Sequence, residues 1–286
     1  MQSRRPRLRL VVISGTTRLA GVIGAPIRHS LSPAIFNAAF RACDLDWVYL
    51  AFDVPPGGAG RALDAMRALD IGGLSVTMPH KDAVAELVDH CTPEAAALHA
   101  VNCVVATGDG LVGENTDGPG FLDALRAETG FEIDGRRAVV LGAGGAARAI
   151  VLALSRAGAA EISVVNRTAE RAEIAASLAG PVGRVSTTDA IEQADLVVNA
   201  TSVGMGDGRA PFDAGRVARG QVVADIVYHP SPTPLVAAAR ERGIVAIDGL
   251  GMLVHQAAHA FRLWTGLDPP IGAMTSAARA ALSTPG

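Results

Sequence analysis

The stretch Ala138-Val139-Val140-Leu141-Gly142-Ala143-Gly144-Gly145-Ala146-Ala147 decides the fold. Its four apolar residues predict a buried strand, and the helical spacing from Ala146 to Arg156 predicts a helix. A Gly-x-Gly-x-x-Ala turn between a strand and a helix is typical of dinucleotide binding. Gly142 permits the tight turn, and Gly144 lets the backbone N–H groups and the helix dipole approach a pyrophosphate. We therefore predict that residues 142–146 bind a dinucleotide.

The next strand, Ile162 to Val165, indicates which dinucleotide binds. NAD sites usually carry an acidic residue about 20 positions after the turn, where it holds the ribose 2′-hydroxyl. Here the strand ends at Asn166-Arg167-Thr168, and Arg171 follows. A solvated arginine at a strand end is common, but a guanidinium in this position would grip a 2′-phosphate. The pattern favours NADP(H).

The glycine turn belongs to a long alternation of strands and helices. Apolar runs predict strands at 20–24, 47–52, 74–77, 138–141, 162–165, 196–200, 222–227 and 244–247, and a hairpin from 100–106 to 111–113. Helical spacing predicts helices at 32–42, 59–69 and 146–156 and a final helix at 252–264. Such alternation predicts an α/β fold with mainly parallel sheets. The length of 286 residues favours two domains.

The composition excludes several classes of function. With 49% hydrophobic and 19% charged residues, the chain is not disordered. A net charge of −3 offers no basic field to nucleic acid or an anionic membrane, and no apolar run is long enough to span a membrane. Three cysteines without a Cys-x-x-Cys motif fit a cytoplasmic protein. His255 and His259 lack the glutamate of a zinc-protease motif, so we predict no metal site.

Two serines follow the first predicted strand, in the segment His29-Ser30-Leu31-Ser32-Pro33. Their hydroxyls could cradle a carboxylate at the start of the next helix. From this fragment alone, however, the simpler interpretation is that Ser32 caps the helix and Pro33 occupies its first position.

Further polar residues lie where other strands of the first half end. Thr77 ends the third strand and Lys81 follows closely, while Asn102 and Asp117 come from the hairpin region. A lysine beside a carboxylate in a cleft can return a proton to a developing alkoxide. Lys81 and Asp117 are therefore candidates for an acid/base pair, although the spacing does not establish that they meet.

A set of ordered segments between about Gly21 and Gly266 resembles one known family. They are GAPIRHSLSP (24–33), VTMPHK (76–81), AVN (100–102), GENTDG (113–118), the glycine turn, NRT (166–168), NATSVGM (199–205) and DGLGMLVHQ (248–256). The chain resembles shikimate dehydrogenase, the NADP-dependent oxidoreductase of aromatic amino-acid biosynthesis, which reversibly reduces 3-dehydroshikimate to shikimate.

The resemblance implies a role for each matching residue. Lys81 would be the catalytic acid/base, paired with Asp117. Ser30 and Ser32 would hold the substrate carboxylate, which displaces the simple capping interpretation. The other implied substrate ligands are Thr77, Asn102, Asp117 and Gln256 at ring hydroxyls, and Tyr228 near the carboxylate. The implied cofactor ligands are Gly142, Ala143, Gly144, Gly145 and Ala146 at the pyrophosphate, Asn166, Arg167, Thr168 and Arg171 around the 2′-phosphate, and Ile226 and Gly249 near the nicotinamide.

The resemblance also implies the domain organisation. A substrate domain would comprise residues 19–116 and 250–286, because the last helices of this family return to the first domain. A Rossmann-like NADP(H) domain would comprise residues 117–249, and we expect residues 1–18 to form a flexible arm. The expected partner is a small-molecule substrate, with the protein a monomer or homodimer.

Two positions depart from the family pattern. The family often has Asn-Val-Thr where this chain has Ser75-Val76-Thr77, and often has histidine where this chain has Phe36. Because serine is shorter than asparagine, a quinate/shikimate or aminoshikimate dehydrogenase with broader substrate or cofactor use stays open. A non-catalytic NADP(H)-binding sensor is a further alternative, although the residues of the cleft are all present.

Overall fold

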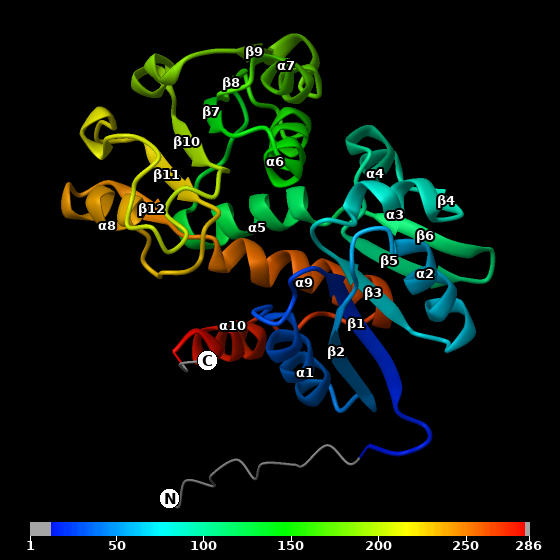
Figure 1. The fold of residues 1–286 in the computed structure, drawn as a ribbon. Coiled ribbons are helices and arrows are strands. Elements are labelled where there is room, and N and C mark those ends of the chain that lie inside the picture. Colours follow the sequence, from blue (N-terminus) through cyan, green and yellow to red (C-terminus); the bar gives the residue numbers. More distant parts are fainter. Residues whose placement is uncertain (1–12, 284–286) are drawn as a thin grey trace, which may run out of the picture.

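The computed structural model describes residues 13–283, whose strands form two six-stranded sheets (Figure 1). In spatial order the first sheet contains β2 (Trp47–Asp53), β1 (Arg18–Gly24), β3 (Gly73–Val76), β5 (Cys103–Thr107), β6 (Gly110–Glu114) and β4 (His90–Cys91). The second contains β12 (Val245–Ile247), β11 (Val222–Asp225), β10 (Leu196–Asn199), β7 (Arg137–Leu141), β8 (Glu161–Val165) and β9 (Gly183–Val185).

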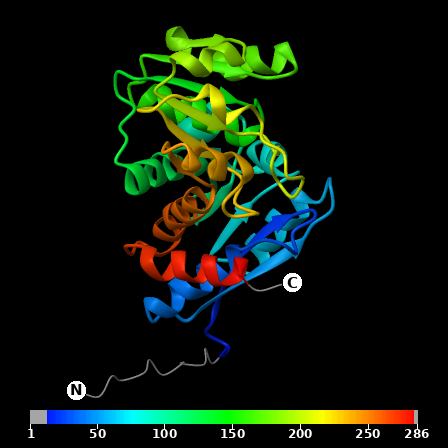
Figure 2. The ribbon, with the colours of Figure 1, turned by 90° about the vertical axis from the view of Figure 1, so that its left-hand side faces the viewer.

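The helices connect and cover these sheets. They are α1 (Ser32–Ala42), α2 (Ala59–Ala68), α3 (Lys81–Leu87), α4 (Pro93–Leu98), α5 (Asp117–Thr129), α6 (Gly145–Arg156), α7 (Ala169–Ser177), α8 (Pro234–Glu241), α9 (Leu250–Thr265) and α10 (Ile271–Leu282). Short 3₁₀ turns lie at Gly180–Val182, Thr188–Gln193 and Ala214–Arg216. In Figure 2 the second sheet lies in the upper part of the view and the first sheet in the lower part, with α9 (orange) between them and α10 (red) in the lower part.

The second sheet has the doubly wound order of a Rossmann fold. All its neighbouring strands are parallel, and the chain leaves the central strand β7 first toward β8 and β9 and then crosses back to β10, β11 and β12. Such sheets bind ligands at the carboxyl ends of their strands, where the order reverses. The predicted α/β class is confirmed, and the glycine turn after β7 lies at that reversal.

The first sheet is mixed. β1 pairs in parallel with both β2 and β3, whereas β5 runs antiparallel to β3 and to β6. The β5–β6 pairing confirms the hairpin predicted from 100–106 to 111–113. Apolar side chains cover both faces of this sheet, so that its polar residues are confined to strand ends and to the few positions discussed below.

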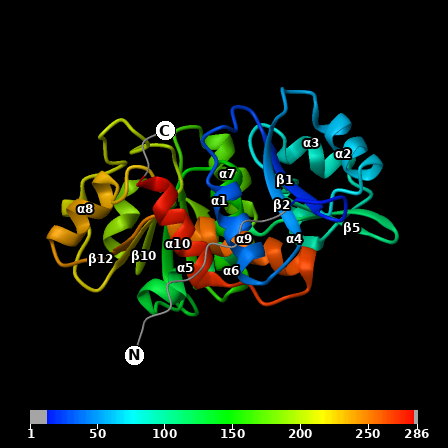
Figure 3. The same cartoon turned by 90° about the horizontal axis from the view of Figure 1, so that it is seen from below.

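Two long helices lie side by side between the sheets, α5 after the first sheet and α9 after the second (Figure 3). A methyl group added at Gly120 of α5 would lie only 2.5 Å from the backbone nitrogen of Gln256 on α9, so glycine is what permits this close approach. At its other end α9 packs into the first sheet, where Trp264 Nε1 donates a hydrogen bond to the Val104 carbonyl (3.1 Å). α9 thus fixes Gln256 relative to both sheets.

Two predictions about the ends of the chain need correction. The helix at 252–264 is not the last, because α10 follows and packs against α1 (Figure 3). Its sequence is rich in small residues and buries only Met274 and Ala278, which leaves little periodic signal. Residues 1–12 of the expected arm lie outside the described residues, but Thr16 and Thr17 donate hydrogen bonds to Asp46. Arg18 already belongs to β1, so the expected arm is too long.

Candidate active site

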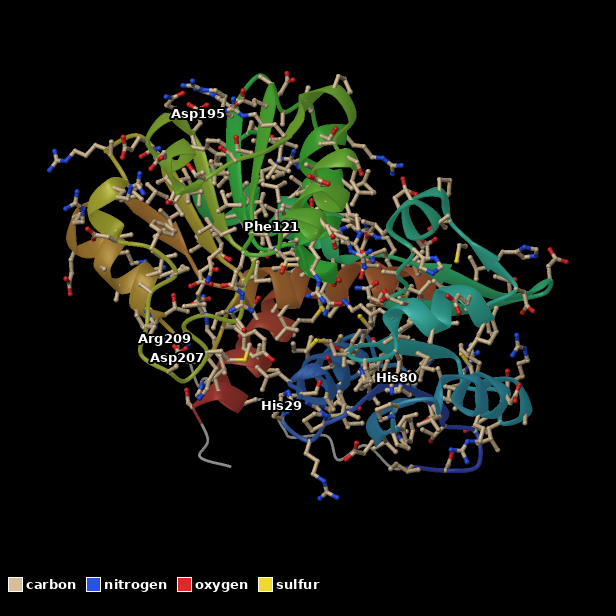
Figure 4. The ribbon with its side chains drawn as sticks, turned by 45° about the horizontal axis from the view of Figure 1, so that its top comes forward. His29, His80, Phe121, Asp195, Asp207 and Arg209 are labelled. Atoms are coloured by element: carbon tan, nitrogen blue, oxygen red, sulfur yellow. The ribbon has the colours of Figure 1, made fainter. Side chains whose placement is uncertain are left out.

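A cavity of about 220 Å³ lies between the end of the first sheet, α5, α9 and the segment after β11. It is lined by every residue that the sequence predicts for catalysis or substrate binding, namely Ser30, Ser32, Thr77, Lys81, Asn102, Asp117, Tyr228 and Gln256. These residues come from six separate parts of the chain, and the fold brings them to one place. Figure 4 shows His29, another wall residue, on the side of the first sheet.

Lys81 and Asp117 form an ion pair inside this cavity. Each is the first residue of a helix, and Lys81 Nζ donates to Asp117 Oδ2 at 2.5 Å. Their side chains are 20% and 9% exposed, so that water screens the pair only partly. The amine is therefore held in one orientation while it remains open to a ligand in the cavity.

Asn102 binds the second oxygen of the Asp117 carboxylate. Its Nδ2 donates to Asp117 Oδ1 (2.7 Å) and to Thr116 Oγ1 (3.0 Å), and its Oδ1 accepts the Thr116 backbone N–H (2.8 Å). Both amide protons are thus used within the protein. The structure gives Asn102 a positioning role toward Asp117, and the predicted contact with a substrate hydroxyl stays a prediction.

The two serines lie at the start of α1, but Ser32 is not its N-cap. Leu31 occupies that position, Ser32 is the first helical residue, and the Ser32 backbone N–H donates to Ser30 Oγ (3.3 Å). Ser30 therefore provides the local hydrogen bond that was predicted for Ser32. This leaves the Ser32 hydroxyl on the cavity wall rather than engaged in capping.

Tyr228 and Gln256 form the side of the cavity nearest the second sheet. Burial raises the pKa of Tyr228, so its phenol is a neutral hydrogen-bonding group at neutral pH. Gln256 donates from Nε2 to the Leu253 carbonyl (2.9 Å), which leaves its Oε1 as an acceptor. Met252 and Leu253 also line the cavity and were missed by the sequence analysis. Their helical spacing of four and three residues from Gln256 is a signal that could have identified them.

The glycine turn has the geometry that a pyrophosphate requires. Gly142 has φ +113°, and an added methyl group would lie 2.6 Å from the Ala200 carbonyl oxygen, so this position requires glycine. Around Gly144 and Gly145, by contrast, no described protein atom lies within 4 Å of an added methyl group. Open space in front of the first N–H groups of α6 fits a bound diphosphate.

The residues predicted for the 2′-phosphate follow β8, the strand next to β7. Asn166 Nδ2 donates to the Thr168 carbonyl (2.9 Å) and so shapes the turn. Arg167 and Arg171 are exposed, and neither forms an ion pair within residues 13–283. Two uncompensated guanidinium groups beside the glycine turn fit a phosphate on the adenosine ribose.

Ile226 and Gly249 connect the cofactor side to the substrate side, since both line the same cavity as Lys81. An added methyl group at Gly249 would lie 2.0 Å from the Ile226 carbonyl oxygen, so this pair packs backbone against backbone. The remaining predicted cofactor residues, 142–146, 166–168 and 171, lie outside the cavity, after β7 and β8 of the second sheet.

Two further observations concern the described part of the chain. Within residues 13–283 no cluster of three or more His, Cys, Asp or Glu side chains is arranged to hold a metal ion. Of the helices in the same range, none has the length and apolar character needed to cross a membrane.

The fold and the cavity together define a class of protein. A Rossmann-type sheet with a phosphate-binding turn, next to a cavity that holds a lysine–carboxylate pair, defines a pyridine-nucleotide-dependent dehydrogenase. Comparison with known proteins specifies the family. Three family models match the chain: "Shikimate dehydrogenase substrate binding domain" at residues 22–104, "Shikimate / quinate 5-dehydrogenase" at 125–205 and "Shikimate 5'-dehydrogenase C-terminal domain" at 249–279. The chain belongs to the shikimate dehydrogenase family.

Individual relatives agree with this assignment. A shikimate dehydrogenase (NADP(+)) from Geobacter sp. (strain M21) is 46% identical over 288 residues, which covers 96% of this chain and 99% of the relative. A solved shikimate dehydrogenase in complex with NADP+ superimposes with a TM-score of 0.90 at 35% identity, covering 96% and 98% of the two chains. The Thermus thermophilus enzyme, solved with NADP(H) and shikimate, gives 0.86 at 41% identity, covering 92% and 99%.

Proposed function

We propose that this protein catalyses the reversible, NADPH-dependent reduction of 3-dehydroshikimate to shikimate. The observation that carries the proposal is the Lys81–Asp117 ion pair, which lies in a cavity shared with Ile226 and Gly249 of the Rossmann side. The fit of the glycine turn and of Arg167 supports NADP(H) as the cofactor. The resemblance over nearly the whole chain supports the substrate.

In this proposal the protein supplies alignment and a proton, because NADPH supplies the hydride when it is bound. Lys81 donates a proton from Nζ to the ring oxygen as the ketone becomes an alcohol, and accepts it in the reverse direction. Asp117 holds the ammonium in place and accepts a hydrogen bond from a neighbouring substrate hydroxyl. Asn102 in turn fixes the carboxylate.

Substrate binding is assigned to the hydroxyl and amide groups of the cavity wall. Ser30 and Ser32 would donate hydrogen bonds to the substrate carboxylate, with Tyr228 close to it. Thr77 and Gln256 would bind ring hydroxyls. A small, polar and partly enclosed cavity favours a compact ligand with several hydroxyl groups.

Steady-state kinetics test the proposal directly. The purified protein should reduce NADP+ with shikimate and oxidise NADPH with 3-dehydroshikimate, and NAD+ should give a much lower kcat/KM. Absence of turnover with shikimate and either cofactor would contradict the proposal, and it would leave the alternative of an NADP(H)-binding sensor.

Quinate is the second candidate substrate, because Ser75 lines the cavity where the family often has the longer asparagine. Assays with shikimate and quinate, each with NADP+ and NAD+, separate the two functions, and an aminoshikimate substrate can be tested in the same format. A cytoplasmic location and a monomeric or homodimeric state stay predictions.

A further inference from the structure

The hydroxyl of Tyr49 neighbours two residues of the cavity wall, Ser32 and Ser75, and has not been given a role. Tyr49 is on β2 and is 0% exposed. Within residues 13–283, its Oη is the single fully buried side-chain polar atom that meets no hydrogen-bond partner. A buried hydroxyl without a partner is costly, so a hydroxyl at such a position needs an explanation.

The ring of Tyr49 cannot move to satisfy its hydroxyl elsewhere. Its backbone is fixed on both sides by Asn37, which accepts the Tyr49 N–H at Oδ1 (2.9 Å) and donates from Nδ2 to the Tyr49 carbonyl (2.9 Å). The ring stacks on Phe36, with centroids 4.4 Å apart and planes 7° from parallel. The phenol is therefore held in one place by its neighbours.

The register of the first sheet brings Tyr49 and Ser75 to the same face. Ala20 of β1 pairs with Tyr49 of β2, and the next residue on that face of β1, Val22, pairs with Ser75 of β3. Alternate residues of a strand share a face, so all four side chains point to the same side of the sheet. Val22 and Ser75 also line the substrate cavity. Ser75 thus lies between the cavity and the buried phenol.

The polar groups that face the phenol are two serines of the cavity wall. Burial raises the pKa of Tyr49, and the hydroxyls of Ser75 and Ser32 partly oppose this increase. Phe36 and Ser75, the two departures from the family pattern, are both neighbours of Tyr49. The Tyr49 ring stacks on Phe36, and the Tyr49 hydroxyl faces Ser75.

We propose that Tyr49 is a positioning residue for the substrate: its buried hydroxyl, which has no hydrogen-bond partner among the described residues, donates to Ser75 Oγ when the substrate binds and so directs the Ser75 proton into the cavity. A serine hydroxyl that accepts from a tyrosine keeps its own proton for another acceptor, and the chain of two hydroxyls strengthens that donor. The group that it would bind is a hydroxyl or carboxylate oxygen of the substrate. This inference rests on the proposed function of the cavity.

The test is a set of single and double variants assayed with shikimate and NADP+. Tyr49→Phe removes only the hydroxyl and keeps the stacked ring. We expect KM for shikimate to rise about 3–10-fold, the usual effect of one lost hydrogen bond. The value of kcat and the KM for NADP+ should stay within about twofold. Ser75→Ala should raise the same KM similarly, and adding Tyr49→Phe to Ser75→Ala should change it less than twofold.

A matched control removes a hydroxyl far from the cavity. Ser155→Ala on α6 loses a hydrogen bond to the Ala179 carbonyl and should leave KM for shikimate unchanged. The inference is overturned if Tyr49→Phe leaves this KM unchanged while its thermal stability changes, which would be a purely structural role. It is equally overturned if the two substitutions have independent effects, or if Ser75→Ala has none.

The wild-type measurement separates this inference from the function on which it rests. If the wild-type protein does not turn over shikimate, the proposed function fails and the inference fails with it. If the wild-type protein is active and Tyr49→Phe behaves identically, only the role of Tyr49 fails. Should Tyr49→Phe not fold, an unchanged KM in Ser75→Ala still refutes the inference.

Discussion

At the scale of single residues, Lys81 is the only lysine among the 25 lysine and arginine residues of the chain. Every other basic position is arginine, whose guanidinium does not lose its proton in proteins. A lysine side chain, by contrast, can donate a proton as the ammonium and accept one as the neutral amine. The one position that keeps lysine is therefore the position where the proposed reaction needs a transferable proton.

Two substitutions at this position separate charge from proton transfer. We expect Lys81→Ala to lower kcat by about 10²–10⁴-fold, the usual contribution of general acid–base catalysis. Lys81→Arg keeps the positive charge near Asp117 and should lower kcat to a similar extent, because it cannot release a proton. The affinity for NADPH, measured by fluorescence titration, should stay close to wild type in both. Near-normal turnover in either variant would contradict the assignment.

The sequence predicts the members of this site better than it predicts their contacts. Lys81, Asp117 and Thr77 could be predicted as candidates because each follows a predicted strand. Their meeting could not be predicted from spacing, because the Lys81–Asp117 contact depends on how β3 and the β5–β6 hairpin pair. The wall residues Met252 and Leu253 were missed because apolar residues on a helix normally signal only a core.

At the scale of elements, the glycine turn after β7 offers a matched pair of variants. Gly144→Ala adds a methyl group in open space, where it would meet a bound pyrophosphate rather than the protein. We expect KM for NADP+ to rise at least tenfold while the unfolding temperature stays within about 1 °C, since no protein contact changes.

Gly142→Ala adds the same methyl group where the protein itself resists it, at a positive φ and against the Ala200 carbonyl. This variant should lose about 1–3 kcal/mol of its free energy of unfolding, and it should also bind the cofactor more weakly. Thermal unfolding of the apoprotein measures the difference in stability between the Gly142→Ala and Gly144→Ala variants. Equal unfolding temperatures for both variants would contradict this account of the turn.

Some helices and strands could be predicted from their local sequence pattern, and others could not. Strands such as β7 and β10 could be predicted because they are short apolar runs between turns. The helix α10 could not, because its alanine-rich sequence buries only Met274 and Ala278 and so lacks a clear apolar stripe. The bounds of α1 agree with the predicted helix at 32–42, but its N-cap was misplaced by one residue, because both Ser30 and Ser32 are residue types that cap helices whereas the cap is Leu31.

At the scale of the whole molecule, the contact between α5 and α9 decides how the two sheets face the cavity. Gly120→Ala would force the backbone of α9 away at Gln256. We expect an overpacking cost of about 1–3 kcal/mol, seen as an unfolding temperature lower by several degrees. KM for shikimate should rise as well, because Gln256 is displaced from the cavity.

Gly272→Ala is the control for this prediction. Gly272 is exposed on α10, and no described atom lies within 4 Å of an added methyl group there. Alanine should stabilise that helix slightly, because it has the higher helix propensity. If Gly120→Ala behaved like Gly272→Ala in both stability and KM, the close approach of α5 and α9 would not be what positions Gln256.

Because the chain contains a single lysine, nitrogen-15 NMR can observe the proposed catalytic amine selectively. Feeding lysine labelled with nitrogen-15 at the side chain would place one magnetic nucleus on Nζ, inside the cavity and against Asp117. Its resonance needs no assignment, since no second side-chain signal of that type exists. Measuring the chemical shift of this Nζ signal against pH reports the protonation of the amine directly. Measuring it as ligands are added shows which ligands reach the ion pair.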